Sequence, residues 1–277
     1  MSGTLYIVAT PIGNLEDMTF RAVRILKEAD LIAAEDTRHS RKLLAHFGIE
    51  TRLTSYYDHN QSLKGEQVLT ALREGRSVAL ISDAGTPCIS DPGYQLARDA
   101  QAAGIAVVPV PGACAAVTAL SAAGLPTNSF TFAGFPPNKE GKRRTFLASL
   151  AQAHGTLVLY EAPHRLAATL ADIGAVLGQR RVVVARELTK LYEEFLHGTP
   201  AELTQLVQEG HERGELVILI AQADEDTQPE GPNPEERLLT ALHAGHSVKE
   251  AAALVAAATG LPRRELYAQA LVLQGRL

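Results

Sequence analysis

The first half of the chain alternates short apolar runs with amphipathic segments. Period-2 and continuous apolar runs predict strands at residues 4–9, 31–35, 51–55, 78–82 and 106–110. Apolar positions at helical spacing predict helices at 19–29, 37–47, 63–74, 94–103 and 115–123. The run Val78-Ala79-Leu80-Ile81 is apolar throughout, as expected for a strand that is covered on both faces. Repeated strand–helix–strand units predict a parallel sheet with right-handed crossovers.

The pattern loosens after Leu125, where strands are expected at 130–133, 156–160, 182–186, 193–198 and 216–221, and helices at 143–151, 165–177 and 200–209. The short connection between the strands at 182–186 and 193–198 permits a hairpin but not a parallel crossover. This half therefore predicts a mixed sheet, and the chain as a whole an α/β protein with two α/β domains, at 1–124 and 125–223.

The last part of the chain differs in composition. Residues 224–234 are acidic and rich in proline, which is typical of a linker. Helical periodicity then predicts three short helices, at 235–244, 248–258 and 263–273, so that 235–277 forms a small module resembling a helix-turn-helix. Arg263 and Arg264 begin its last helix and are candidates for an RNA or protein contact.

Composition and charge narrow the class of protein. Hydrophobic residues make up 46% and charged residues 21%, as in an ordinary globular protein. No apolar run approaches the ~20 residues that span a bilayer, and no basic segment precedes the first strand, so we expect a cytoplasmic protein without a membrane anchor. Cys88 and Cys114 are too few for a disulfide framework, and neither cysteines nor histidines have metal-ligand spacing, so no metal is expected. A net charge of −5 argues against a uniformly basic nucleic-acid binder but allows local basic patches.

Three loops at the carboxyl ends of strands in the first sheet are candidates for a ligand site, because open parallel sheets bind ligands at that edge. The loop at 9–15 lacks the Gly-x-Gly-x-x-Gly motif of nicotinamide enzymes, although Glu35 and Asp36 end the next strand. The loop at 82–93 is long and rich in glycine and proline, beyond what a connection needs. The loop at 108–116 has small residues that open a helix, which tight packing explains equally well.

These loops resemble the tetrapyrrole (corrin/porphyrin) methylase superfamily. Gly85-Thr86-Pro87 is similar to its Gly-Asp-Pro motif, with Thr86 in place of Asp, and Pro111-Gly112-Ala113-Cys114-Ala115 is similar to its Pro-Gly-x-Ser-Ser/Ala motif, with Cys114 in place of Ser. The resemblance covers residues 4–221 and places the boundary between the two domains near Leu125. It implies S-adenosylmethionine as the methyl donor.

Five further segments resemble one branch, the bacterial 16S ribosomal RNA cytidine-2′-O-methyltransferases. They are Glu35-Asp36-Thr37-Arg38-His39-Ser40, the segment 82–87, Phe135-Pro136-Pro137-Asn138-Lys139, Tyr160-Glu161-Ala162-Pro163-His164-Arg165 and Ala185-Arg186-Glu187-Leu188-Thr189-Lys190. This resemblance implies methylation of a cytidine ribose in the decoding region of 16S rRNA, with the free RNA or the small ribosomal subunit as partner, and a homodimer. The alternatives are a corrin or porphyrin methyltransferase, a non-catalytic RNA-binding protein and a nicotinamide oxidoreductase.

The candidate residues follow from these segments. The expected donor contacts are Pro11, Asp83, Gly85, Thr86, Pro87, Ile89, Ser90, Pro111, Cys114, Ala115 and Tyr160. The expected RNA contacts are Arg38, Arg41, Lys42, Lys139, Lys142, Arg143, Arg144, Arg165 and Arg186, with Lys139, Lys142, Arg143 and Arg144 expected in one loop. A ribose hydroxyl needs a base or a nearby cation to react, and the candidates are Glu187, Lys190, Glu161 and Asp36. Each of these four could instead be half of a structural ion pair.

Overall fold

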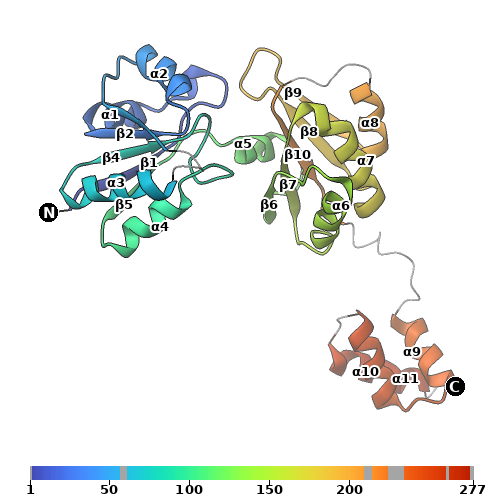
Figure 1. Ribbon diagram of the computed structural model, residues 1–277. Helices are drawn as coiled ribbons and strands as arrows, with labels where there is room; N and C mark the ends of the chain where they lie inside the picture. The colour runs from blue at the N-terminus through green and yellow to red at the C-terminus, as the bar shows by residue number, and fades with distance from the viewer. Residues whose placement is uncertain (1, 57–60, 209–213, 224–233, 260–261, 275–277) are drawn as a thin grey trace. The chain divides into compact units, whose positions relative to one another are not determined.

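The structure is a computed structural model that describes residues 2–56, 61–208, 214–223, 234–259 and 262–274. It divides into two compact units, Met1–Gln222 and Ala223–Leu277. The first unit begins with a sheet of five parallel strands in the order β3-β2-β4-β1-β5 (Figure 1). Its strands are β1 (Thr4–Val8), β2 (Leu31–Ala34), β3 (Leu53–Ser55), β4 (Val78–Ile81) and β5 (Ala106–Val110). The parallel sheet predicted from the sequence is confirmed.

Helices cover both faces of this sheet because its strands are apolar on both sides. They are α1 (Phe20–Glu28), α2 (Thr37–His46), α3 (Gln61–Arg73) and α4 (Tyr94–Ala102), with a 3-10 turn, η1 (Leu15–Asp17), before α1. Helices α1 and α2 bury Ile25 and Leu44 against one face, and α3 and α4 bury Leu72 and Leu96 against the other. Thr19 is the N-cap of α1, because its side chain accepts a hydrogen bond from the Ala22 amide at 3.1 Å.

The second sheet of the same unit is mixed, with the order β6-β7-β10-β8-β9. Its strands are β6 (Phe130–Gly134), β7 (Thr156–Glu161), β8 (Val182–Arg186), β9 (Glu194–Gly198) and β10 (Leu216–Ile220). Strands β6 and β7 are parallel, and the other neighbours are antiparallel. The predicted hairpin of β8 and β9 is confirmed.

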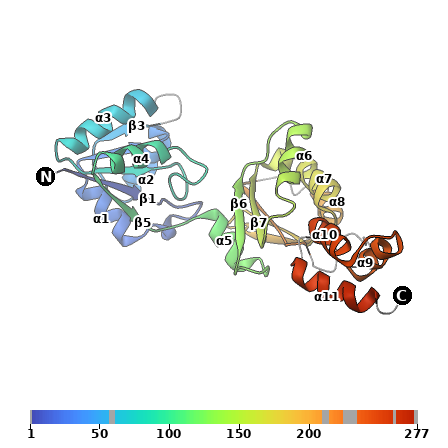
Figure 2. The ribbon, with the colours of Figure 1, turned by 90° about the horizontal axis from the view of Figure 1, so that it is seen from below.

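One face of the second sheet packs against α6 (Glu140–Ser149), α7 (Leu166–Leu177) and α8 (Pro200–Gln208), with a 3-10 turn, η3 (Pro163–Arg165), before α7. The other face is covered by α5 (Ala115–Ala122), whose Ala119 and Leu120 pack with Val183 and Leu219. Figures 1 and 2 both show α5 beside the second sheet. Helix α5 therefore belongs by packing to the second sheet, although the predicted boundary near Leu125 assigned it to the first domain. The domain limits remain a prediction.

The second unit contains α9 (Pro234–His243), α10 (Val248–Thr259) and α11 (Arg263–Gln274). These helices enclose a small core of their own, to which Leu238, Val255 and Leu266 contribute. The three predicted helices are confirmed. The predicted linker, residues 224–234, lies outside the described residues apart from Pro234, where α9 begins.

Candidate functional site

The three loops singled out in the sequence meet at one edge of the first sheet, because β4, β1 and β5 are neighbours and run in the same direction. Thr10 and Gly85 exchange two backbone hydrogen bonds, of 2.8 and 3.1 Å, which join the first loop to the second. The Thr86 hydroxyl donates to the carbonyl oxygen of Ala113 at 3.0 Å and joins the second loop to the third. The loops thus form one continuous wall.

The second loop follows a path that few residues adopt. Cys88 and Ser90 have positive φ angles of 72° and 62°, in the left-handed region where non-glycine residues are uncommon. Gly93 has a φ of 135°, and a Cβ atom there would lie 2.7 Å from Leu80 Cδ2. Such strained backbone is typical of ligand sites, where the surrounding structure holds it in place.

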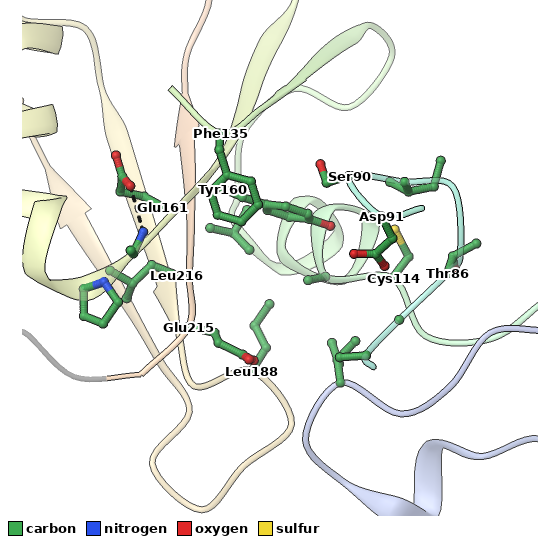
Figure 3. Close-up of a pocket in the computed structure, with 18 residues that line it drawn as sticks. Thr86, Ser90, Asp91, Cys114, Phe135, Tyr160, Glu161, Leu188, Glu215 and Leu216 are labelled. Atoms are coloured by element: carbon green, nitrogen blue, oxygen red, sulfur yellow. Dashed lines mark hydrogen bonds between the residues drawn. The ribbon is translucent and has the colours of Figure 1, made fainter. Parts of the chain in front are cut away.

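A cavity of about 340 Å³ opens between these loops and the ends of β7 and β10 (Figure 3). We call it the first cavity. Seven of the predicted donor contacts line it: Gly85, Thr86, Ile89, Ser90, Cys114, Ala115 and Tyr160. Its volume falls in the range of small-molecule sites, and its wall combines apolar side chains with a few polar groups.

Part of this wall was not among the residues predicted from the sequence. The additional lining residues are Ile12, Ala84, Asp91, Phe135, Ala162, Pro163, Leu188, Glu215, Leu216 and Val217. Ala84, Phe135, Ala162, Pro163 and Leu188 lie inside the segments that carry the family resemblance, and that resemblance is the sequence signal for them. No such segment contains Glu215, Leu216 or Val217. They reach the cavity because β10 pairs with β7, with Leu216 opposite Glu161.

Tyr160 is the best-fixed side chain of the first cavity. Its hydroxyl oxygen accepts a hydrogen bond from the Ala116 amide at 3.1 Å, in the first turn of α5. Its ring contacts Phe132 and Phe135 edge-on, with centroids 4.8 and 5.5 Å apart. Burial raises the pKa of Tyr160, so the phenol stays neutral. Tyr160 therefore gives the cavity a rigid aromatic wall with one hydroxyl.

A second cavity, of about 290 Å³, lies beside the first loop and is lined by Pro11, Gly13, Leu15, His39, Lys42, Leu43 and Asp83. Pro11 and Asp83, predicted as donor contacts, are therefore in the wall of this cavity and not of the first. Asp83 Oδ1 accepts a hydrogen bond from the Asp36 amide at 3.0 Å. Pro87 and Pro111 line neither cavity within the part of the chain that the structure describes.

Lys190 contacts the wall of both cavities. Its ammonium lies 3.1 Å from Glu187 Oε1 and 3.6 Å from an oxygen of Glu215, which lines the first cavity. Its aliphatic stem packs on Gly13, which lines the second cavity, so closely that a Cβ atom at Gly13 would lie 2.7 Å from Lys190 Cγ. Partial burial acts to lower the pKa of Lys190, but the two carboxylates outweigh it and raise that pKa above its usual value. Lys190 is therefore a cation held between the cavities.

Two other catalytic candidates have structural roles. Both oxygens of Asp36 are occupied by Arg38, and Asp36 caps α2 by accepting from the Arg38 amide at 2.8 Å. The hydrogen bonds from Arg38 lower the pKa of Asp36 to about 2, so it is a poor base.

Glu161 lines the first cavity, but its oxygens accept from the Thr169 hydroxyl at 2.5 Å and from the Ala162 amide at 2.8 Å, and Arg165 lies 3.1 Å away. The contacts of Asp36 and Glu161 within the protein thus argue against the catalytic roles predicted for them.

The predicted RNA contacts fall into two groups, those exposed to solvent and those held by ion pairs within the protein. Arg38, Arg41 and Lys42 are exposed on α2, although Arg38 pairs with Asp36. Lys139 and Lys142 are exposed as well. The expected loop at 139–144 is wrong, because α6 begins at Glu140 and contains three of its four cations.

The burial of Arg143 contradicts its predicted contact with RNA. It is only 5% exposed and lies 2.6 Å from Asp172, which is itself buried, so it holds α6 against α7 and cannot reach RNA. Arg144 shares Asp172 at 2.7 Å and also pairs with Glu140.

Arg165 and Arg186 are mostly buried and bound to the protein. Arg165 donates to the Asn138 side chain and to the Pro136 carbonyl, in addition to its pair with Glu161. Arg186 pairs with Glu194 at 2.8 Å, across the β8–β9 hairpin. Both side chains are 17% exposed, so their predicted role in binding phosphate would require these contacts to open.

The described residues contain neither a cluster of metal-ligating side chains nor a membrane-spanning helix. No group of three or more His, Cys, Asp or Glu side chains there could hold a metal ion. No helix among the same residues is long and apolar enough to cross a membrane.

Comparisons with known proteins agree with this geometry. Residues 4–204 match the family of tetrapyrrole (corrin/porphyrin) methylases, and residues 230–274 match the RsmI C-terminal HTH domain. The chain is 50% identical over 270 residues to a ribosomal RNA small subunit methyltransferase I from Halalkalibacterium halodurans, covering 96% of this chain and 93% of the relative. It is 51% identical over 280 residues to the protein of the same name from Pseudomonas aeruginosa, covering 99% of both chains.

Solved structures extend the likeness of the fold. Uroporphyrin-III C-methyltransferase from Thermus thermophilus, complexed with S-adenosylhomocysteine, is 21% identical and superposes with a TM-score of 0.53, covering 78% of this chain and 96% of that one. The matches to the two relatives extend over the residues of both sheets and of the three C-terminal helices. The chain therefore belongs to the tetrapyrrole (corrin/porphyrin) methylase family, in the branch of the ribosomal RNA small subunit methyltransferases I.

Proposed function

We propose that this chain transfers the methyl group of S-adenosylmethionine to small-subunit ribosomal RNA, with the donor in the first cavity and the acceptor ribose at the second. The observation that carries the proposal is the position of Lys190, which contacts Glu215 in the wall of one cavity and Gly13 in the wall of the other. The family membership supplies the reaction class, and the two cavities supply a place for each reactant.

The lining of the first cavity suits the donor in its chemistry. Gly85, with a φ of 79°, lets the loop turn without a side chain at the wall. Ile12, Ile89 and Leu188 offer apolar surface to a nucleoside, and Tyr160 and Phe135 offer ring surface. S-adenosylmethionine would supply an electrophilic methyl group on a sulfonium centre. The remaining task of the protein is to align that methyl with the acceptor oxygen.

The polar side chains at the second cavity suit contact with an RNA backbone. His39 and Lys42 line it, and Arg41 is exposed on the same helix. Cations that cluster on one surface attract phosphate even when the net charge of the protein is −5. Phosphate contacts of this kind fix the position of the RNA backbone and leave the ribose to be presented to the site.

The residues at the junction can promote the reaction. The acceptor oxygen would form a bond to the methyl carbon as the carbon–sulfur bond breaks and S-adenosylhomocysteine leaves. The hydroxyl proton would pass to solvent water, so negative charge develops on the oxygen during the transfer. A fixed ammonium near that oxygen stabilises the charge without needing to reorient, which is often the largest single contribution to catalysis. Lys190 is such a group, and Glu187 and Glu215 keep it protonated and oriented.

The finer assignment comes from the family resemblance. We propose that the acceptor is the 2′-hydroxyl of a cytidine in the decoding region of 16S rRNA, that the protein works in the cytoplasm and that it does so as a homodimer. A tetrapyrrole acceptor is the alternative. The exposed cations Lys42, Lys139 and Lys142 and the helical tail favour RNA.

Incubation with labelled S-adenosylmethionine tests the proposal. Purified protein is mixed in parallel with small ribosomal subunits that lack the modification and with a precorrin. We expect label only in the RNA of the subunits. Label in the precorrin, or in neither acceptor, would contradict the proposed acceptor.

A further inference from the structure

Three carboxylates line the first cavity, and two of them are balanced by the protein. Glu161 has Arg165 at 3.1 Å and two further hydrogen-bond donors. Glu215 has the ammonium of Lys190 at 3.6 Å. The third carboxylate, Asp91, lies on the opposite wall with Ser90 and Thr86 (Figure 3).

Asp91 has no cation to balance it among the residues that the structure describes. No lysine, arginine or histidine contributes to its pKa, and no ion pair involves it. Burial raises the pKa of Asp91, a hydrogen bond from Ser82 opposes this effect, and the nearby charge of Asp83 adds to it. The other titratable groups that its charge influences are Cys88 and Tyr160, and neither is a cation. The protein thus places a negative charge at the cavity wall and leaves it uncompensated.

The cavity around Asp91 is mainly apolar, with Ile12, Ile89 and Leu216 in its wall. A carboxylate in such surroundings loses hydration, and the hydrogen bond from Ser82 offsets that loss only in part, so a cation bound beside it would stabilise the charge. The position is thus suited to a positively charged ligand and unsuited to a neutral or anionic one. Because Figure 3 shows the Asp91 carboxylate directed into the cavity beside Cys114, a ligand there would meet it directly.

We propose that Asp91 is the residue that binds the positive charge of the methyl donor and makes the first cavity selective for cationic ligands. This inference rests on the proposed function, because it assigns S-adenosylmethionine to this cavity. The donor carries two cationic groups, the sulfonium and the ammonium of its methionine part. The demethylated product, S-adenosylhomocysteine, retains only the ammonium.

Isothermal titration calorimetry with a set of ligands that differ in charge tests the inference. The ligands are S-adenosylmethionine, S-adenosylhomocysteine and 5′-methylthioadenosine, which carries neither cationic group. For Asp91→Asn we expect affinity for S-adenosylmethionine to fall about 10- to 100-fold, as for loss of a hydrogen bond to a charged group. Affinity for 5′-methylthioadenosine should stay unchanged or rise. S-adenosylhomocysteine then identifies the group that Asp91 binds: a loss equal to that of the donor indicates the ammonium, and no loss indicates the sulfonium.

Two further variants keep the test decisive. Asp91→Ser removes the same charge with a smaller side chain and should show the same selective loss, in case the asparagine variant folds poorly. Asp99→Asn, on the exposed surface of α4, is the matched control and should bind every ligand as the unaltered protein does. Equal affinity of Asp91→Asn and the unaltered protein for S-adenosylmethionine would overturn the inference. If the unaltered protein binds none of the ligands, the proposed function itself fails, which is a different outcome.

Discussion

The substitution Gly13→Ala, which adds one methyl group, tests the position of Lys190 between the two cavities. In Gly13→Ala, the new Cβ atom would lie 2.7 Å from Lys190 Cγ, 2.9 Å from its Cε and 3.0 Å from the hydroxyl oxygen of Thr189. Carbon atoms in contact prefer separations of about 3.5–4.0 Å, so the lysine stem must move by roughly 1 Å. A displacement of this size in a catalytic group can reduce the rate by about 100-fold. We therefore expect kcat to fall by roughly 10- to 100-fold.

The same substitution should leave folding and donor binding intact. Gly13 is exposed and is not among the glycines with positive φ, so alanine fits its backbone, and the obstructing atoms belong mainly to a flexible side chain. The assay compares kcat with labelled donor and small ribosomal subunits, the Kd for S-adenosylmethionine by calorimetry, and the Tm. Gly141→Ala on α6, where a Cβ atom meets nothing within 4 Å, is the matched control. An unchanged kcat in Gly13→Ala would refute the role given to Lys190, and equal losses in kcat and donor affinity would show that the donor site was disturbed instead.

Three further predictions concern charge. Asp172→Ala leaves the Arg143 cation buried without its partner, so urea denaturation should show a free energy of unfolding lower by about 3–5 kcal/mol. Lys142→Ala, on the exposed side of the same helix, should change it by less than about 0.5 kcal/mol. Similar values for the two variants would contradict the structural role of Arg143. Lys42→Ala should weaken RNA binding without changing donor affinity, and the slope of log binding constant against log salt concentration should become shallower by about 1. Filter binding at several salt concentrations measures this slope, and an unaltered slope would exclude a phosphate contact. Asp91→Asn should stabilise the ligand-free protein. Because folding raises the pKa of Asp91, its charged form is disfavoured in the folded state. The gain in the free energy of unfolding should therefore be absent below the unfolded pKa and grow as pH rises towards and through the folded pKa. Denaturation between about pH 4 and about pH 8 measures this gain, and a gain that shrinks with rising pH would contradict the direction of the pKa shift.

Local patterns in the sequence predicted most of the fold. The apolar run at Val78–Ile81 predicted a strand covered on both faces, and apolar positions at helical spacing predicted the helices that cover the first sheet. The sequence also predicted that the three loops lie at the carboxyl edge of one parallel sheet, whereas the strand order that makes them neighbours is seen only in the structure.

What the sequence could not supply depends on contacts between distant segments. Arg143 and Lys142 are neighbours in one basic run, and only the position of Asp172, 29 residues beyond Arg143, decides which of them is buried. Glu215 and Leu216 reach the first cavity through the pairing of β10 with β7, which no local pattern specifies. Helix α5 follows the first sheet in sequence but packs on the second, because its small apolar residues suit that face.

The most direct test of the account is mass spectrometry of 16S ribosomal RNA from cells that lack this protein, before and after the gene is restored. We predict that one ribose-methylated cytidine of the decoding region is absent without the protein, returns with the unaltered chain, and returns much less with Lys190→Ala. An RNA whose methylation is the same with and without the protein would contradict it.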